Sequence, residues 1–225
     1  LAHQIEAQTR NYEVCEEVME RGLALVKLDG FQKAIDEDGA EIYTAEVYYP
    51  VDRERLLARW EDWHDQAGRF GFHYVPYNFE SNPEQNFFEQ LLTHLHIHPE
   101  EVEDIYFTGA LTDPKKTDFY VEYKGDDNKW HRYTPDFIIR RKDGKCLIVE
   151  IKDARFETAT RQDLTRDEQG KVAITVEGRK AVALKKWERL NPDRLKYQIL
   201  FANNDLIGYD EIREAYEFVK RKNAT

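Results

Sequence analysis

The chain has 225 residues, a net charge of −11, 41% hydrophobic residues and 13% aromatic residues. This composition predicts one large domain with a packed core and excludes a disordered protein. It contains no apolar run long enough to span a membrane and no signal-peptide pattern, so we expect a cytoplasmic protein without a membrane partner. Cys15 and Cys146 lie far apart, which favours a reducing compartment over a disulfide framework. Because the sequence starts at Leu1 rather than Met, we expect it to be part of a longer polypeptide.

The acidic charge is concentrated in the N-terminal part of the chain. Residues 1–100 contain 8 Lys and Arg against 20 Asp and Glu, whereas residues 132–196 contain 17 basic and 11 acidic residues. The second region is therefore locally basic, which is compatible with a polyanionic partner such as a nucleic acid.

The first part of the chain mixes helical and strand-like segments. Residues 5–28 and 52–69 have helical composition, and IYTAEVYYPV (42–51) is strand-like. We expect an N-terminal α+β appendage, residues 1–75, followed by the main domain, residues 76–225. Seven aromatic residues of the appendage are expected to pack in a core or interface rather than to stack on bases: Tyr43, Tyr48, Tyr49, Trp60, Trp63, Phe70 and Phe72.

Helices and strands alternate in the main domain. SNPEQNFFEQLLTHL (81–95) begins like a helix, with Ser81 or Asn82 as N-cap and Pro83 in the first turn. The polar residues 155–176 are expected to form a loop or short hairpin close to the site described below. The other expected elements are strands at 72–79, 117–124, 129–133, 137–139 and 146–149, a helix at 178–190, a strand at 197–202 and a helix at 209–220. This order predicts an α/β fold with a central mixed β-sheet flanked by helices.

Three ionisable residues stand at the ends of two apolar strands in YTPDFIIRRKDGKCLIVEIK (133–152). Side chains alternate between the faces of a strand, so Glu150 and Lys152 project from the same face. Asp136 starts the preceding strand, and a hairpin turn around Gly144 would place it close to Glu150. Two carboxylates brought together repel, and burial adds a desolvation cost. A divalent metal removes that difficulty, and hard oxygen ligands suit Mg²⁺.

Two flanking helices each direct one more charged residue towards this strand pair. Glu84 falls within the apolar stripe of the helix 81–95, and Lys180 lies on the same helix face as Leu184 and Trp187. A lone Glu-x-Lys on an edge strand is ordinarily a device against aggregation. The convergence with Glu84 and a Pro-Asp pair favours a metal site instead, whereas Lys180 is equally well explained as a lysine that packs its stem on the helix surface.

Two further patterns carry less information. The run HLHIHP contains His94, His96 and His98, but no other metal ligands join them, and histidine is favoured at helix C-termini. We therefore expect a solvated helix end rather than a zinc site. The turn that contains Arg140 and Arg141 is a candidate for phosphate contacts beside the predicted site.

Pro135-Asp136 followed by Glu150-Ile151-Lys152, with the helical Glu84 upstream, resembles the PD-(D/E)xK nuclease superfamily, which has the restriction-endonuclease-like fold. More narrowly, five segments are similar to the nuclease domain that ends the restriction (Res) subunit of type III restriction enzymes: SNPEQNFFEQL, DFYVEY, YTPDFIIR, IVEIKD and RKAVALKKWERLNPDRLKYQILF. The resemblance covers about residues 78–205 and says little about residues 1–75.

The resemblance implies a Mg²⁺-dependent endodeoxyribonuclease that hydrolyses double-stranded DNA in prokaryotic restriction-modification and phage defence, with Mn²⁺ as a substitute. Asp136, Glu150 and the backbone carbonyl of Ile151 would hold the metal. Lys152 would orient the attacking water, and Glu84 would complete the metal shell. Lys180 would contact a phosphate. The family also implies a methyltransferase (specificity) subunit as partner and an ATP-driven helicase motor, for which this chain has no GxxxxGK[ST] pattern.

Other functions fit the same residues. One is a transposon-encoded or DNA-repair nuclease of the same fold. Another is a non-catalytic DNA- or protein-binding module, although such a module has no need of clustered carboxylates in a core. The acidic N-terminal part could serve mainly to dock onto a motor domain or a methyltransferase subunit.

Overall fold

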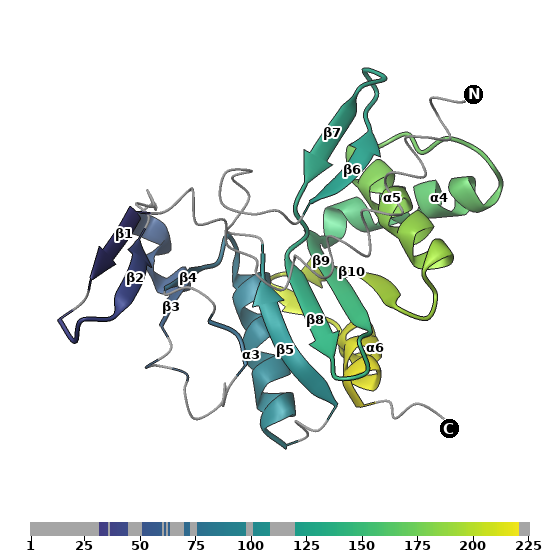
Figure 1. Cartoon of the computed structure of the whole chain (residues 1–225). Coiled ribbons are helices and arrows are strands. Elements are labelled where there is room, and N and C mark those ends of the chain that lie inside the picture. The colour runs from purple at the N-terminus through teal and green to yellow at the C-terminus, as the bar shows by residue number, and fades with distance from the viewer. Residues whose placement is uncertain are drawn as a thin grey trace.

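The computed structural model describes residues 32–35, 37–44, 51–59, 61, 63, 70–72, 76–97, 101–108 and 120–220. These residues form an α/β structure in which helices flank a mixed five-stranded sheet (Figure 1). The α/β class expected from the sequence is thus confirmed. In the described part of the chain, the helices fall short of the length and apolarity that crossing a bilayer requires.

The central sheet has the strand order β11-β10-β9-β8-β5. Strand β8 pairs antiparallel with both β5 and β9, whereas β10 pairs parallel with β9. A parallel neighbour requires a crossover connection, and the helices α4 and α5 supply it. The bounds of these elements are β5 Val102–Phe107, β8 Phe137–Arg141, β9 Cys146–Asp153, α4 Glu157–Glu168, α5 Val176–Leu190, β10 Leu195–Asn203 and β11 Leu206–Ile207.

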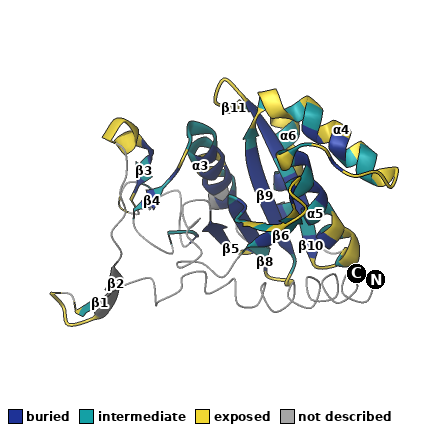
Figure 2. Ribbon diagram, turned by 90° about the horizontal axis from the view of Figure 1, so that it is seen from above, coloured by how far each residue is buried: buried dark blue, intermediate teal, exposed yellow. Residues whose placement is uncertain are grey.

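The alternation of β9 separates two apolar clusters, one on each face of the sheet. Leu147 and Val149 pack in the cluster that also contains residues of α3 (Asn82–Ile97) and α6 (Tyr209–Lys220). Cys146 and Ile148 pack in the other cluster, together with residues of α5. Figure 2 shows the buried residues along the central strands and on the helix sides that face them. The faces predicted from the sequence are therefore correct.

Part of the predicted appendage packs against the main domain. After the hairpin of β1 (Gln32–Ile35) and β2 (Glu41–Thr44), the 3-10 helix η3 (Val51–Leu56) leads into β3 (Leu57–Ala58), which pairs with β4 (Tyr77–Asn78). Leu56, Ala58 and Phe70 are buried in the same cluster as α3. The domain boundary near residue 75 stays a prediction.

The packing role expected for the aromatic residues is confirmed where they can be seen. The Trp63 ring stacks on Phe88 with 5.7 Å between centroids, and Phe72 stacks on Tyr77 at 4.8 Å. Phe70 is buried with them in one cluster. The other predicted members, Tyr48, Tyr49, Trp60 and the side chain of Tyr43, lie outside the described residues.

Several sequence predictions differ from the structure. Residues 52–69 were expected to be helical, but Val51–Leu56 form a 3-10 helix and Leu57–Ala58 belong to strand β3. The polar segment 155–176 is not a loop or hairpin, because residues 157–168 form α4. One edge of the central sheet is formed by β5, a strand that the sequence did not predict. A register shift between Val102 and Asp104 interrupts the alternation by which a strand is recognised. Strands β6 (Val121–Lys124) and β7 (Trp130–Tyr133) form a separate two-stranded sheet instead of extending the central one.

Candidate active site

The β8–β9 hairpin places two carboxylates opposite each other. Its last paired residues are Phe137 and Val149, so the next step of the same register joins Asp136 to Glu150. Paired residues point to the same side of a sheet, and here it is the side covered by α5. The glutamate side chain is 4% exposed, whereas the aspartate keeps some contact with solvent.

Backbone contacts fix the position of Asp136. Thr108, which follows β5, donates its backbone N–H to the Asp136 carbonyl at 2.8 Å, and its hydroxyl donates to the carbonyl of Pro135. The side-chain Oδ2 of Asp136 accepts the backbone N–H of Ile151 at 2.6 Å. The carboxylate is thereby tied to the strand that carries Glu150.

Lys152 joins this pair to the first turn of α5. Its Nζ lies 2.6 Å from Glu150 Oε1 and 3.6 Å from Glu177 Oε2. The other oxygen of Glu177 lies 3.0 Å from Lys180 Nζ. The structure thus brings Asp136, Glu150, Lys152 and Lys180 into one polar cluster.

Burial and charge shape the proton affinities of the cluster. Burial raises the pKa of Asp136 well above its usual range, and the carboxylates of Glu150 and Glu84 raise it further. Burial likewise raises the pKa of Glu150, although Lys152 partly offsets it. Burial opposes the charged form of Lys152, but the Glu150 and Asp136 carboxylates outweigh that effect and raise its pKa. The carboxyl groups of Asp136 and Glu150 are therefore harder to ionise than exposed carboxyl groups.

Glu84 is buried at the start of α3, close enough for its charge to act on Asp136. Both of its oxygens have local partners: the backbone N–H of Glu80 at 2.9 Å and the hydroxyl of Ser81 at 2.7 Å. Both donors precede α3, so the Glu84 side chain holds the segment that leads into the helix. Burial raises the pKa of Glu84. The residue thus belongs to the electrostatic environment of the site and also fixes the entry to α3.

The residues fit a hard divalent cation. Glu150 Oε2 is buried without a hydrogen-bond partner, and an orphaned buried carboxylate oxygen is unfavourable unless a ligand completes it. Among the described residues, no group of three or more His, Cys, Asp or Glu side chains is already arranged around a metal position. Mg²⁺ is commonly bound through one or two carboxylates together with waters and substrate phosphates, so Asp136 and Glu150 suffice.

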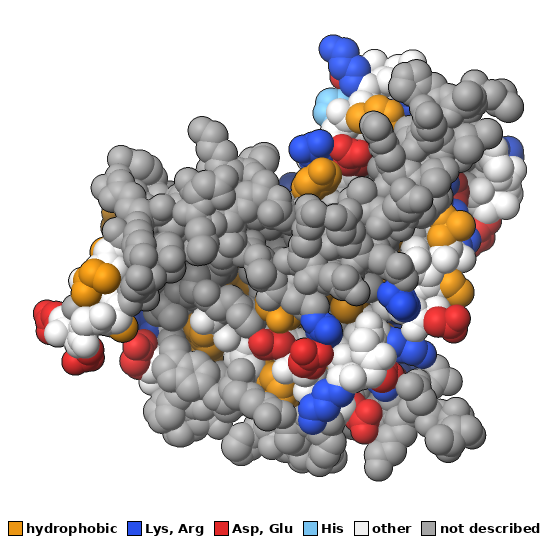
Figure 3. Space-filling model, in the orientation of Figure 1, with side chains coloured by type: hydrophobic (Ala, Val, Ile, Leu, Met, Phe, Trp, Pro, Cys, Tyr) orange, Lys and Arg blue, Asp and Glu red, His pale blue; other side chains and the backbone are white. Residues whose placement is uncertain are grey.

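The arginines of the hairpin lie away from the site, so their predicted position beside it is wrong. Arg140 pairs in register with Cys146, next to the turn and at the opposite end of the ladder from Asp136. Its guanidinium is 2.9 Å from Glu103, and the buried Arg141 binds Asp143 at 2.9 Å. On the face of the molecule shown in Figure 3, acidic and basic side chains of the described residues are interspersed.

The prediction of a solvated helix end is wrong for His94, whose Nε2 atom is buried. The ring of His94 stacks on Tyr216 of α6, with 4.3 Å between centroids. The side chain of His96 and all of His98 lie outside the described residues.

Glu177 is a member of the cluster that sequence reasoning missed. The helix was expected to start at Gly178, which left Glu177 in the preceding loop. In the structure α5 begins at Val176, and Thr175 caps it by accepting the backbone N–H of Gly178. A capping threonine followed by an acidic residue three positions before Lys180 was the available signal.

The chain matches no protein-family model, and neither a curated protein nor a solved structure shows significant similarity to it. The chemistry of the site and its geometry therefore carry the functional inference.

Proposed function

We propose that the protein is a Mg²⁺-dependent endonuclease that hydrolyses phosphodiester bonds in double-stranded DNA. One observation carries the proposal: Asp136 and Glu150 face each other at the end of an apolar strand pair, and one buried Glu150 oxygen has no partner. Lys152 lies 2.6 Å from the other oxygen. Two carboxylates and an ammonium in one place match what a metal and a phosphate require.

Each residue of the cluster has a distinct role in the proposed reaction. Asp136, Glu150 and the backbone carbonyl of Ile151 would hold the metal, which when bound polarises a phosphate and lowers the pKa of a coordinated water. Lys152 remains protonated at neutral pH because its pKa is raised. It therefore acts as a cation that orients the water and stabilises charge on the phosphate, and not as a general base. Lys180, at the edge of the cluster, would contact a phosphate.

The finer assignment rests on the sequence resemblance together with the topology. We infer a restriction-endonuclease-like fold and the nuclease part of a prokaryotic type III restriction enzyme. Support comes from the antiparallel β8–β9 pair, the parallel neighbour β10 and the helices on both faces. In that setting a helicase motor and a methyltransferase subunit would act with this chain.

A plasmid assay tests the proposed activity. Purified protein is incubated with supercoiled plasmid in Mg²⁺, in Mn²⁺ and in EDTA, and nicked and linear products are quantified. We expect cleavage with either metal and none in EDTA. Lys152→Ala should lower the rate by about a hundredfold or more, the usual effect of removing one group that stabilises charge in the transition state.

The control is Lys185→Ala on α5. Lys185 also forms an ion pair with a glutamate, Glu188, at 2.6 Å, so the two variants remove comparable pairs. Lys185→Ala should cleave like the wild type. Full activity of Lys152→Ala would refute the assignment.

A non-catalytic DNA-binding module is the second candidate. It is favoured by the contacts within the cluster, since Glu150 and Glu177 neutralise Lys152 and both Glu84 oxygens have local donors. The same assay separates the candidates: plasmid that is bound but uncut in Mg²⁺ and Mn²⁺ supports the module.

A further inference from the structure

A second concave site lies beside the cluster, between the β6–β7 hairpin, α5 and residues 170–173. Its volume is about 410 Å³, within the range of small-ligand pockets. Trp187 and Val182 of α5 line it from one side, and Tyr123 and Trp130 of the hairpin line it from the other. Trp187 is buried, whereas the Trp130 side chain is 51% exposed. The pocket therefore combines an apolar floor with an accessible aromatic ring.

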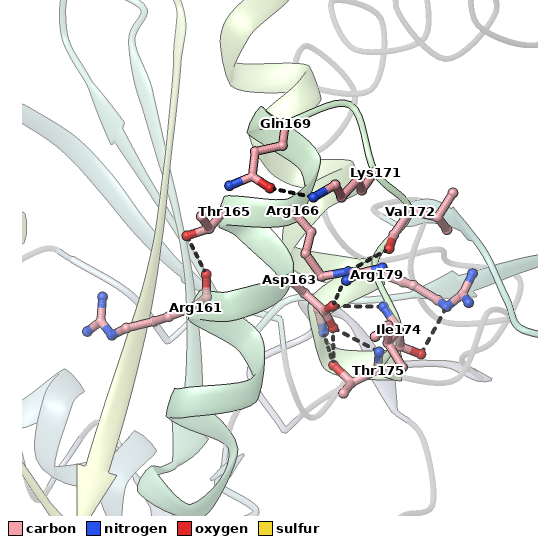
Figure 4. A network of polar contacts seen from close by, with 11 residues as sticks. Arg161, Asp163, Thr165, Arg166, Gln169, Lys171, Val172, Ile174, Thr175 and Arg179 are labelled. Atoms are coloured by element: carbon pink, nitrogen blue, oxygen red, sulfur yellow. Dashed lines mark hydrogen bonds and ion pairs between the residues drawn. The ribbon is translucent and has the colours of Figure 1, made fainter.

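The loop that forms one wall of the pocket is fixed by a buried carboxylate. Asp163 of α4 accepts the backbone N–H groups of Ile174 and Thr175, each at 2.8 Å. Arg166 of the same helix donates to the carbonyl of Val172 at 3.1 Å. Figure 4 shows these contacts converging on the segment that links α4 to α5. The wall is held in place without a ligand.

The opposite wall is tied to helix α5. Arg179 of α5 donates to the carbonyls of Lys124 and Gly125 at 3.3 and 3.2 Å. These bonds join the tip of the β6–β7 hairpin to α5 across the pocket. A pocket with one wall bonded to α4 and the other to α5 is preorganised, which reduces the entropy lost when a ligand binds.

The rim of the pocket favours an anion. Its carboxylates are held by arginines: Glu122 lies 3.0 Å from Arg132, and Asp167 lies 2.7 Å from Arg189. Of the rim lysines, Lys171 donates to the neutral amide of Gln169. Lysines 124 and 171 are both exposed. An anionic group next to a bound ring would meet these ammonium groups.

We propose that this pocket binds an unpaired base of a nucleic-acid strand. A base would stack on Trp130 while the flanking phosphates meet Lys124 and Lys171, the combination by which proteins hold single strands.

Binding without cleavage tests the proposal independently of nuclease activity. The probe is a fluorescent single strand of about 12 thymidine nucleotides, within the site size of single-strand binders, measured by anisotropy in EDTA. The comparison strands are a base-free (abasic) strand of equal length and a duplex. We expect the thymidine strand to bind more tightly than both, because only it combines phosphates with unpaired bases.

Variants assign the binding to the pocket. Trp130→Ala should weaken binding of the thymidine strand by about tenfold, the loss expected for one stacked base, and leave the abasic strand unaffected. Trp130→Tyr should retain most of the affinity, and Val172→Glu should lower it by adding a carboxylate at the rim. The matched control is Tyr209→Ala, which removes an aromatic side chain that is 71% exposed at the start of α6.

Three results would overturn the proposal. They are equal binding of the thymidine and abasic strands, unchanged affinity in both Trp130→Ala and Val172→Glu, and no measurable binding of the thymidine strand. Lys152→Ala, which tests the nuclease assignment, should bind the strand like the wild type. A failure of cleavage and a failure of base binding are therefore distinguishable.

Discussion

Asp136 and Glu150 stand opposite each other at the end of the β8–β9 ladder, one register step beyond an apolar pair. Burial raises the pKa of each carboxyl group, and for Asp136 the neighbouring carboxylate adds to the effect. Neutral side chains at these two positions would make the folded state more stable. Ionisable groups with shifted pKa values concentrate at functional sites, where they are kept at a cost in stability. The pair should therefore be both functionally required and destabilising.

Asp136→Asn should stabilise the protein at neutral pH. A carboxyl group whose pKa is raised in the folded state binds its proton more tightly there than in the unfolded chain. Its penalty is therefore absent below the unfolded pKa of about 3.9 and grows as the pH rises through the folded value. We expect the thermal midpoint at pH 8 to rise by about 2–4 °C, which corresponds to roughly 1 kcal/mol in a chain of this size.

The pH dependence provides the control for this prediction. The gain from Asp136→Asn should shrink as the pH is lowered and vanish near pH 3–4, where the aspartate is neutral in both states. Asp193→Asn replaces an exposed aspartate in the turn before β10 and should change nothing at either pH. Calorimetric scans from pH 3 to 8 measure both variants. A pH-independent gain would contradict the argument.

Mg²⁺ should raise the thermal midpoint of the wild type. A ligand present at ten times its dissociation constant stabilises the folded state by about 1.4 kcal/mol, or about 3–6 °C here. Asp136→Asn and Glu150→Gln should lose this shift, because each removes a carboxylate ligand. Glu103→Gln, at the opposite end of the hairpin next to Arg140, should keep it. An undiminished Mg²⁺ shift in Glu150→Gln would show that the cation binds elsewhere.

The sequence predicted the strand pair that carries the site because the relevant signals are local. Alternation within CLIVEIK assigned Glu150 and Lys152 to one face, and the turn at Gly144 fixed which strand ends meet. The start of α3, signalled by Pro83 in its first turn, and the stripe that included Glu84 were likewise properties of single segments.

What the sequence did not predict depends on contacts between segments. Helix α4 has no apolar stripe, so its sequence resembles that of a loop. Asp163 and Thr160 are buried by tertiary contacts, such as the hydrogen bond from the backbone N–H of Ile174 to Asp163. Glu177 entered the site only because the capping threonine starts α5 two residues earlier than expected. Arg140 was predicted to lie beside the site, but the length of the hairpin separates its turn from the strand ends that carry Asp136 and Glu150.

Glu177→Gln should strengthen the binding of duplex DNA in EDTA. The Glu177 carboxylate neutralises Lys180 at 3.0 Å and Lys152 at 3.6 Å, so its removal frees about one lysine for a phosphate. Affinity should rise, and the plot of log affinity against log salt should steepen by about 0.9. Glu188→Gln is the matched control: its partner Lys185 also binds the Tyr197 carbonyl at 2.9 Å, and the slope should stay unchanged. Identical slopes for the two variants would show that Glu177 does not mask a phosphate-binding lysine.

Gly178→Ala should destabilise the protein even though alanine is the better helix former. An added Cβ at Gly178 would lie 2.5 Å from Cβ of Asp163, and a contact that close forces the buried residue to move. We expect a loss of about 1–3 kcal/mol in urea unfolding, typical of overpacking, instead of the usual gain of roughly 0.5–1 kcal/mol. In Gly208→Ala the nearest atom lies 3.9 Å away, so no clash arises.

A double-mutant cycle identifies the cause of that loss. Asp163→Ala removes the two side-chain oxygens that bind Ile174 and Thr175. It also removes much of the side chain with which an alanine at position 178 would clash. If the clash is responsible, Gly178→Ala should cost much less in the Asp163→Ala background, with an interaction energy of about 1 kcal/mol or more. Additive losses would mean that the glycine is required for another reason. Because Asp163 also holds the wall of the pocket, both single variants should weaken binding of the thymidine strand, whereas Gly208→Ala should not.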